Sequence, residues 1–278
     1  MKAPAFQYAR PNSVEEVCSL LATHEDAQIL AGGQSLVAAM NMRLASPAVL
    51  IDINKIKGLS DIHVEKSDSL VIGATVRHVQ IQTSPLVAQR APLLTKAMGY
   101  VAHPSIQNRG THCGSLAFAD PAAEMPACAL VLSAQLELQS TQGRRMVDAE
   151  DFFLGVYETA CQPNEFLIAA HYPMTYNRRF GFGEIAPRHG DFAKVGLALN
   201  VESEAGKWRD LRLVVFSCEP MPRLLTDVAA LAEGQTPSAS LFAALADAVA
   251  ASIMPMDHEN VRRHQARGLA LQVFERAL

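Results

Sequence analysis

The spacing of apolar residues in the first part of the chain is the feature that most restricts its fold. Residues 13–21 combine a capping-box start with apolar positions at helical intervals, and residues 35–44 repeat the helical spacing behind a serine. Short apolar runs at residues 27–30 and 49–53 alternate with these helices. Helix and strand therefore alternate over residues 1–55, which favours a small parallel sheet.

A glycine pair, Gly32-Gly33, separates the predicted strand at residues 27–30 from the helix that Ser35 opens. Glycine lets the backbone approach an oxyanion closely, and a helix start directs unpaired N–H groups at the same place. A second turn, residues 111–115, also joins glycine and serine ahead of a predicted helix. Such turns also occur where nothing binds, and neither GxGxxG nor GxxxxGK[ST] is present. The residues alone therefore indicate phosphate-binding turns without naming a ligand.

The middle of the chain predicts a mixture of strands and helices. Strands are predicted at residues 70–73, 134–139 and 166–172. Helices are predicted at residues 76–82 with Thr75 as N-cap, at residues 85–102, and at residues 121–132, where Pro126 allows a break or a late start.

The pattern changes after Pro173. Strand-like runs with short polar connections predict an antiparallel meander at residues 180–186, 192–202 and 211–218. Helices rich in Ala and Leu are predicted at residues 223–231, 238–252 and 258–277. We therefore place a domain boundary near residue 175.

Composition and cysteine spacing exclude several classes of function. A net charge of −4, a pI near 6.1 and the lack of a basic stripe argue against nucleic acid as a partner. The five cysteines are scattered and never spaced as CxxC, which argues against a disulfide framework, a structural zinc or an iron–sulfur cluster in this chain. No run approaches the ~18 apolar residues of a membrane helix, and no signal-peptide core is present. We expect a cytoplasmic protein without a metal or a membrane segment of its own.

Three ordered motifs carry a resemblance that covers nearly the whole chain. The first is ILAGGQSL at residues 29–36. The second is VAHPSIQNRGT at residues 101–111, which continues as GSLA at residues 114–117 and DPAAE at residues 120–124. The third is RHGDFA at residues 188–193. With these motifs the chain resembles the flavin-carrying medium subunit of molybdenum hydroxylases, enzymes similar to bacterial carbon monoxide dehydrogenase, quinoline oxidoreductase and xanthine dehydrogenase.

The resemblance implies a fold and a cofactor. The fold is α+β, with a two-subdomain PCMH-type FAD-binding domain at residues 1–175, divided into about 1–55 and 56–175. A C-terminal domain of a small antiparallel sheet plus helices would follow at residues 176–278. The cofactor that this chain would hold is FAD.

The resemblance also implies a cofactor site, residue by residue. The segment expected to wrap the pyrophosphate is Leu30, Ala31, Gly32, Gly33, Gln34 and Ser35, flanked by Ile29 and Leu36. The residues expected on its other side are Thr111, Gly114, Ser115 and Ala117. An acidic residue, Glu124, is expected against the ribityl or ribose hydroxyls. The residues expected to border the flavin ring are Val101, Ala102 and Leu167, with Phe192 shielding it.

The second turn departs from the family pattern, which usually reads Thr-Ile/Val-Gly-Gly. Here it reads THCG, so Cys113 stands where the family has its first glycine. We expect a backbone that tolerates a small side chain, with Cys113 packed beside the cofactor rather than acting as a redox thiol. We expect His112 to be a polar residue at the rim of the site, and Arg188 and Asp191 to pair or to cap a turn.

Three functions remain open from the sequence. In the first, the chain passes electrons from iron–sulfur clusters of a partner through FAD to an external acceptor. A flavin carries its own redox chemistry, so this hypothesis needs no catalytic acid or base in the chain. The second is a self-sufficient FAD-dependent oxidoreductase of the same cofactor-binding superfamily. The third is a binding module that keeps the fold without the cofactor.

The first hypothesis also implies partner chains. A large subunit would carry molybdopterin, and a small subunit would carry two-iron two-sulfur clusters. The resemblance implies a dimer of such heterotrimers. The substrate meets the large subunit, so this sequence names neither the substrate nor the electron acceptor.

Overall fold

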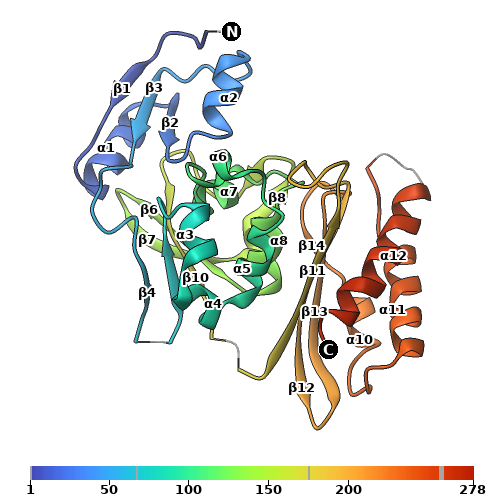
Figure 1. The fold of residues 1–278 in the computed structure, drawn as a ribbon. Coiled ribbons are helices and arrows are strands. Elements are labelled where there is room, and N and C mark those ends of the chain that lie inside the picture. Colours follow the sequence, from blue (N-terminus) through green and yellow to red (C-terminus); the bar gives the residue numbers. More distant parts are fainter. Residues whose placement is uncertain (1, 67, 175, 257–259) are drawn as a thin grey trace.

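The N-terminal part of the chain is a small parallel sheet with two helices. The computed structural model describes residues 2–66, 68–174, 176–256 and 260–278. Strands β1 (Gln7–Ala9), β2 (Ala27–Leu30) and β3 (Val49–Asp52) form a sheet in the order β1-β3-β2, and both pairings are parallel. Helices α1 (Val14–Thr23) and α2 (Leu36–Asn41) connect the strands (Figure 1). The predicted parallel sheet is confirmed, and β1 was missed because it is only 3 residues long.

The middle part is an antiparallel sheet covered by short helices. Its strands are β4 (Ile62–Val64), β5 (Leu70–Gly73), β6 (Gln135–Ser140), β7 (Gly143–Asp148) and β10 (Phe166–Tyr172), in the order β4-β5-β10-β6-β7. Its helices are α3 (His78–Thr83), α4 (Pro85–Arg90), α5 (Pro92–Met98), α6 (Pro104–Gln107), α7 (His112–Phe118), α8 (Glu124–Val131) and α9 (Ala149–Phe152). A small hairpin joins β8 (Phe153–Gly155) and β9 (Glu158–Thr159). Every residue of the central strand β10 is buried.

Three predicted helices in the first two parts are corrected by the structure. The helix expected at 85–102 is two helices, because Pro92 cannot supply the N–H that would continue α4. The helix expected behind Thr75 begins at His78, since Thr75 lies in a turn after β5 and donates its N–H to the carbonyl oxygen of Leu59. Helix α2 ends at Asn41 instead of residue 44. The late start allowed for the helix at 121–132 is what the structure has, at Glu124.

The C-terminal part is a four-stranded antiparallel sheet with a helical pair on its outer face. Strands β11 (Arg178–Ile185), β12 (Val195–Glu204), β13 (Lys207–Phe216) and β14 (Arg223–Leu224) follow one another in space. Helices α10 (Thr226–Ala230), α11 (Ala239–Ser252) and α12 (Asn260–Glu275) follow the sheet. The meander is confirmed, but the predicted helix at 223–231 begins with strand β14. The predicted start at residue 258 lies outside the described residues, as does the boundary at residue 175.

The C-terminal sheet buries both of its faces. One face packs under α11 and α12 around Trp208, whose ring lies 5.3 Å from that of Phe242. The opposite face contributes Phe182 and Phe216 to the core that also holds α5 and α8 (Figure 1). The rings of these two phenylalanines are stacked at 5.7 Å. This second face therefore fixes the C-terminal part against the helices of the middle part.

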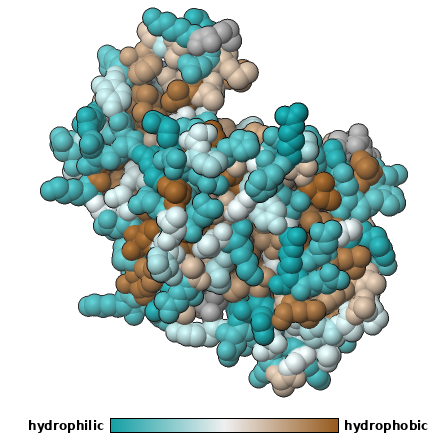
Figure 2. Space-filling view, viewed as in Figure 1, coloured by the Kyte–Doolittle hydropathy of each residue, from teal (hydrophilic) through white to brown (hydrophobic). Residues whose placement is uncertain are grey.

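The outer surface is uneven in polarity. Hydrophobic side chains gather on the N-terminal lobe, at the top of the view, whereas much of the face below it is hydrophilic (Figure 2). On this lobe Val37, Met42 and Leu44 are 39%, 61% and 76% exposed. We refer to these three residues as the α2 patch.

Replacing Gly196 by alanine tests the packing at the junction of the C-terminal sheet with the middle part. A Cβ atom at Gly196 would lie 2.1 Å from the ring of Phe216, which is fully buried. We expect Gly196→Ala to lower the free energy of unfolding by about 1–3 kcal/mol through overpacking, measured by chemical denaturation. Gly268→Ala is the control, because nothing lies within 4 Å of the added atom. Equal stabilities of the two variants would contradict this packing.

Candidate functional site

The first glycine-bearing turn lies against residues 109–110, which directly precede the second turn, where the N-terminal part meets the middle part. A Cβ atom at Gly32 would lie 2.5 Å from the carbonyl oxygen of Arg109 and 2.8 Å from Cα of Gly110. Only glycine permits this approach of two backbones. The guanidinium of Arg77 donates to the Arg109 carbonyl oxygen and to Oδ1 of Asn54, so one side chain ties the second turn to the end of β3.

Asn54 holds the first turn from the opposite side. Its Nδ2 donates to the carbonyl oxygens of Leu30 at 3.3 Å and Ala31 at 2.8 Å. Asp52 accepts from the backbone N–H of Asn54 at 2.9 Å and also from the hydroxyl of Tyr8. These bonds turn the carbonyl groups of the first turn toward Asn54, and its N–H groups are left for a ligand.

The first turn presents unpaired backbone donors. The N–H groups of Gly32, Gly33, Gln34 and Ser35 have no acceptor among the residues that the structure describes. Gly33 has a φ of +71°, in the left-handed region. Successive N–H groups around a left-handed residue form a concave site for an anion. The arrangement suits a phosphate oxygen.

The second turn differs from its prediction. Gly114 and Ser115 lie inside the first turn of α7 and not ahead of the helix, which begins at His112. Thr111 is the N-cap, and its hydroxyl accepts from the N–H of Gly114 at 3.1 Å. A Cβ atom at Gly114 would lie 2.4 Å from that hydroxyl oxygen. Because α2 and α7 have only 6 and 7 residues, the helix dipoles contribute little and the free N–H groups matter more.

The third motif is held against the second. Gly190 has a φ of +82°, and a Cβ atom there would lie 2.7 Å from the carbonyl oxygen of Ala102. Ala102 itself has a φ of +45°. The buried amide of Gln107 donates to the carbonyl oxygen of Val101 at 2.7 Å and fixes this bend. Phe192, two residues after Gly190, is 70% exposed.

The remaining predicted residues occupy different depths. Leu167 is buried in β10, next to a register shift against β6, and Ala117 is exposed on α7. Glu124 is buried as the first residue of α8. Burial, and then the charge of Asp120, raises the pKa of the Glu124 carboxyl to about 7.

The expectation for His112 is wrong, because its side chain is fully buried and not at a rim. Its Nε2 lies 2.6 Å from the hydroxyl of Tyr172, while Nδ1 has no partner among the described residues. Burial lowers the pKa of His112 to about 3, and the nearby His78 adds to this. His78 is also buried, and burial lowers its pKa to about 4. Both imidazoles are therefore neutral at pH 7.

Cys113 occupies ordinary helical backbone, so no positive φ strains it. Its thiol is buried and donates to the carbonyl oxygen of Ile72 at 3.5 Å. Burial raises the pKa of the thiol well above its usual value. Since the thiolate is the reactive form, Cys113 is an inert packing residue in this environment.

Sequence reasoning missed Asn54, Arg77 and Gln107. Each is a polar residue whose partners are backbone carbonyls of another segment, so no local spacing identifies it. The one available signal is position. Asn54 directly follows the predicted strand 49–53, where the ends of parallel strands gather functional groups.

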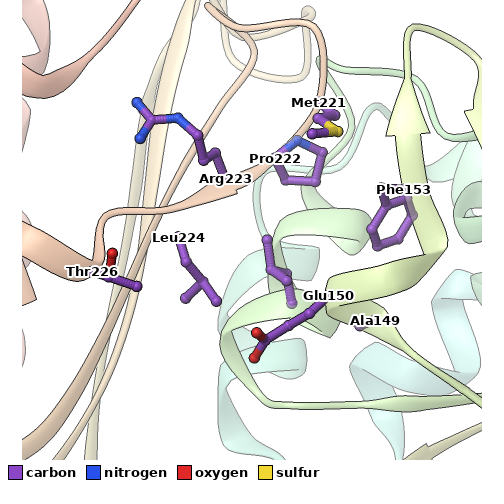
Figure 3. Close-up of a pocket in the computed structure, with 9 residues that line it drawn as sticks. Ala149, Glu150, Phe153, Met221, Pro222, Arg223, Leu224 and Thr226 are labelled. Atoms are coloured by element: carbon purple, nitrogen blue, oxygen red, sulfur yellow. The ribbon is translucent and has the colours of Figure 1, made fainter.

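Two cavities lie away from these turns. One of about 220 Å³ lies where Met221, Pro222 and Leu224 face Glu150 and Phe153 (Figure 3). The other, of about 330 Å³, is lined by residues including Tyr176, Arg178, Asn200, Asp210 and Arg212. Their charged groups are paired, for example Glu150 with Arg212 at 2.6 Å and Arg178 with Asp210 at 2.8 Å. Neither cavity contains a predicted site residue.

The described part of the chain contains neither a metal-binding cluster nor a membrane-spanning helix. Over residues 2–66, 68–174, 176–256 and 260–278, no group of three or more His, Cys, Asp or Glu side chains could hold a metal ion. In the same part of the chain, no helix has the length and apolarity to cross a membrane.

Comparison with known families accounts for both halves of this arrangement. Residues 4–175 match the family described as the FAD binding domain in molybdopterin dehydrogenase. The chain belongs to this family. Residues 181–277 match the CO dehydrogenase flavoprotein C-terminal domain.

Relatives and solved structures agree over the full length. The chain is 36% identical to the nicotine 6-hydroxylase medium subunit of Paenarthrobacter nicotinovorans, covering 100% of this chain and 98% of the relative. It is 32% identical to the carbon monoxide dehydrogenase medium chain of Hydrogenophaga pseudoflava, covering 100% and 97%. The structure of quinoline 2-oxidoreductase from Pseudomonas putida 86 superposes with a TM-score of 0.95 at 33% identity, covering 100% of this chain and 98% of that one. The predicted fold and family are confirmed.

The site's geometry fits the family's cofactor. FAD carries a diphosphate, and the first turn offers free N–H groups around a left-handed glycine, beside the guanidinium of Arg77. The close approach of Gly32 to Arg109 and Gly110 leaves no room for a side chain there. The residues present therefore suit an FAD-binding domain.

Replacing Gly32 by alanine tests the contact between the turns. The added Cβ would overlap the Arg109–Gly110 backbone, so the turns must separate and the free N–H groups must shift. We expect Gly32→Ala to weaken FAD binding at least tenfold, which is about 1.4 kcal/mol, and so to lower the FAD occupancy, measured by the flavin absorbance per chain. Gly268→Ala, with open space around its Cβ, should keep wild-type occupancy. Equal occupancy in both variants would count against the placement of the diphosphate.

Acid should destabilise the chain through His78 and His112. Both have folded pKa values, about 4 and about 3, below the usual value of 6.5, so the unfolded chain binds more protons. Their contribution is complete above pH 6.5 and is lost as the pH falls toward 4. Valine is one of the residues usual at position 112 in the family pattern. We expect the free energy of unfolding of His112→Val to fall less between pH 6.5 and pH 4 than that of the wild type. Parallel stability curves from pH 7 to 4, by urea denaturation, would contradict the neutral buried imidazole.

Proposed function

We propose that this chain is the FAD-carrying electron-transfer subunit of a multi-subunit molybdenum hydroxylase. Electrons would arrive from the iron–sulfur clusters of a partner chain and leave through FAD to an external acceptor. The bound FAD supplies the redox chemistry. The observation that carries the proposal is the row of free N–H groups at Gly32–Ser35, held against the second turn by Arg77.

Each segment of the chain has a proposed part in holding FAD. The backbone of Leu30–Ser35 binds the diphosphate, and Thr111–Ser115 closes the opposite side. Val101, Ala102 and Leu167 border the flavin ring, and Phe192 covers it. The bend of Val101 fixed by Gln107 and the packing of Gly190 on Ala102 support this assignment. No side chain in the proposed site acts as an acid or base.

The proposed domain division is residues 1–175 for FAD binding and residues 176–278 for the C-terminal domain. Two observations support it. The matches to the two families meet between residues 175 and 181. The sheet β11–β14 also forms a core of its own with α11 and α12.

The proposed partners are a large molybdopterin subunit and a small iron–sulfur subunit, arranged as a dimer of heterotrimers in the cytoplasm. The relatives named above are medium subunits or medium chains of dehydrogenases and hydroxylases. The exposed α2 patch consists of Val37, Met42 and Leu44. Exposed apolar patches of this kind often mark protein–protein interfaces, which supports contact with a partner chain. Partner chains would also supply the molybdenum and iron–sulfur centres.

Purification of the native assembly tests this function against its alternatives. We expect the chain to purify yellow, with about one FAD per chain, together with two further chains that contain molybdenum and iron. The isolated chain should bind FAD but oxidise no substrate by itself. Substrate turnover by the isolated chain would favour a self-sufficient oxidoreductase. A colourless chain that stays colourless after FAD is added would favour a binding module instead.

A further inference from the structure

The last residue after helix α12 reaches around the free edge of the C-terminal sheet. Strand β11 is the edge strand of that sheet, and an edge strand leaves every second carbonyl group without a strand partner. Two such carbonyl oxygens, of Phe180 and Phe182, accept from Lys96 at 3.2 Å and from Arg276 at 2.5 Å. Gly183 leaves space for this reach, because a Cβ atom there would lie 3.0 Å from the guanidinium of Arg276.

The same guanidinium binds Tyr100, which follows α5 in the middle part. Nη1 of Arg276 donates to the hydroxyl oxygen of Tyr100 at 3.0 Å. Among the described residues no carboxylate pairs with Arg276, so the two uncharged oxygens of Tyr100 and Phe182 are its acceptors. The end of the C-terminal helix is therefore bonded directly to the segment that leads into the second motif.

Tyr100 in turn contacts the third motif, residues 188–193. The ring of Tyr100 lies 5.1 Å from that of Phe182 and 6.5 Å from that of His189, both in tilted geometry. These distances lie in the range of aromatic contacts. Tyr100 thus connects three segments: the end of α12, strand β11 and the start of the third motif.

The residues after Tyr100 pack on the same motif. A Cβ atom at Gly190 would lie 2.7 Å from the carbonyl oxygen of Ala102 and 2.9 Å from the ring of His103. The backbone before Phe192 is therefore held in place, whereas the Phe192 side chain itself is 70% exposed. An exposed aromatic ring on a fixed backbone suits contact with a flat aromatic ligand.

We propose that Arg276 and Tyr100 are positioning residues for the flavin ring. The inference rests on the function proposed above, in which Val101 and Ala102 border the ring and Phe192 covers it. Arg276 holds Tyr100, and Tyr100 holds together the bordering segment and the segment that covers the ring. In the part of the chain that the structure describes, neither side chain is hydrogen-bonded to residues 30–35 or 111–115. The C-terminal domain thus sets how well the ring is covered, and the glycine turns set how tightly the dinucleotide is held.

The variant Arg276→Met separates these two effects. It removes both hydrogen bonds and keeps most of the apolar length of the side chain. In the FAD-loaded full chain, iodide should quench the flavin fluorescence about twofold more or better, because losing the contact shifts the equilibrium from a covered to an open ring. The visible absorption band should also shift toward that of free FAD. The FAD affinity, titrated on the flavin-free chain, should stay within about threefold of the wild type.

Tyr100→Phe tests whether the two residues act through one contact. It keeps the ring and its neighbours, but it removes the oxygen that accepts from Arg276. The double variant Arg276→Met/Tyr100→Phe should therefore show no larger change in quenching than Arg276→Met alone. Arg276→Lys keeps a cationic donor and should recover part of the wild-type spectrum. Additive effects of the two single variants would overturn the shared contact.

Arg267→Met is the matched control on the same helix. The guanidinium of Arg267 pairs with Asp247 of α11, within the helical pair and away from the middle part. This control should keep the wild-type flavin spectrum and quenching. A wild-type spectrum and quenching in Arg276→Met would overturn the inference, whatever happens to its unfolding temperature. Equal spectral changes in Arg276→Met and Arg267→Met would also overturn it, since the effect would then belong to α12 in general.

The wild-type chain distinguishes a failure of this inference from a failure of the proposed function. A wild-type chain that takes no FAD contradicts the function on which the inference rests. A wild type that binds FAD, with an unchanged flavin ring in Arg276→Met, overturns the positioning role alone.

Discussion

The approach of Gly32 to the backbone of Arg109 and Gly110 is the contact on which the rest of the site depends. It brings a turn of the N-terminal sheet against a turn of the middle part, with no side chain between them. Arg77 then closes the contact by donating to both sides of it. Because Asn54 takes the carbonyl groups of the first turn, the N–H groups of that turn stay free. The anion site is thus a product of backbone geometry and of two partly buried polar side chains, Arg77 and Asn54.

Regular periodicity made much of the fold predictable. The alternation over residues 1–55 predicted the parallel sheet, and the runs after Pro173 predicted the meander, because both patterns follow directly from which face of an element is buried. The errors occurred where one residue overrides the pattern. Pro92 divides a stretch whose apolar spacing continues unbroken across it. The short strand β1 gains its pairing from β3 and has no pattern of its own.

The candidate site was predictable in its motifs but not in its supports. Glycine turns have a local signature, and they identified the segments that the structure brings together. Gln107 acts on a carbonyl several residues away, and Arg77 acts on one in a different turn, so their roles depend on the three-dimensional fold. The burial of His112 also could not be read locally, since its partner Tyr172 comes from β10. The individual contacts to the cofactor remain predictions.

The polar groups of the candidate cofactor site differ from those buried behind it. Unpaired N–H donors at Gly32–Ser35 suit an anion. The neutral imidazoles of His78 and His112 and the thiol of Cys113 lie buried behind the second turn, where they pack instead of reacting. The chain therefore holds and orients a redox group without offering an acid or base of its own.

The most direct test of the proposed diphosphate site compares the affinities of FAD and riboflavin for the flavin-free chain. Charge-assisted hydrogen bonds contribute about 1.5–3 kcal/mol each, and riboflavin lacks the diphosphate that the turns are proposed to bind. Calorimetric titration should show FAD binding at one per chain and about 100-fold or more tighter than riboflavin. Equal affinities for the two flavins would contradict the claim that the meeting of the two turns is the diphosphate site.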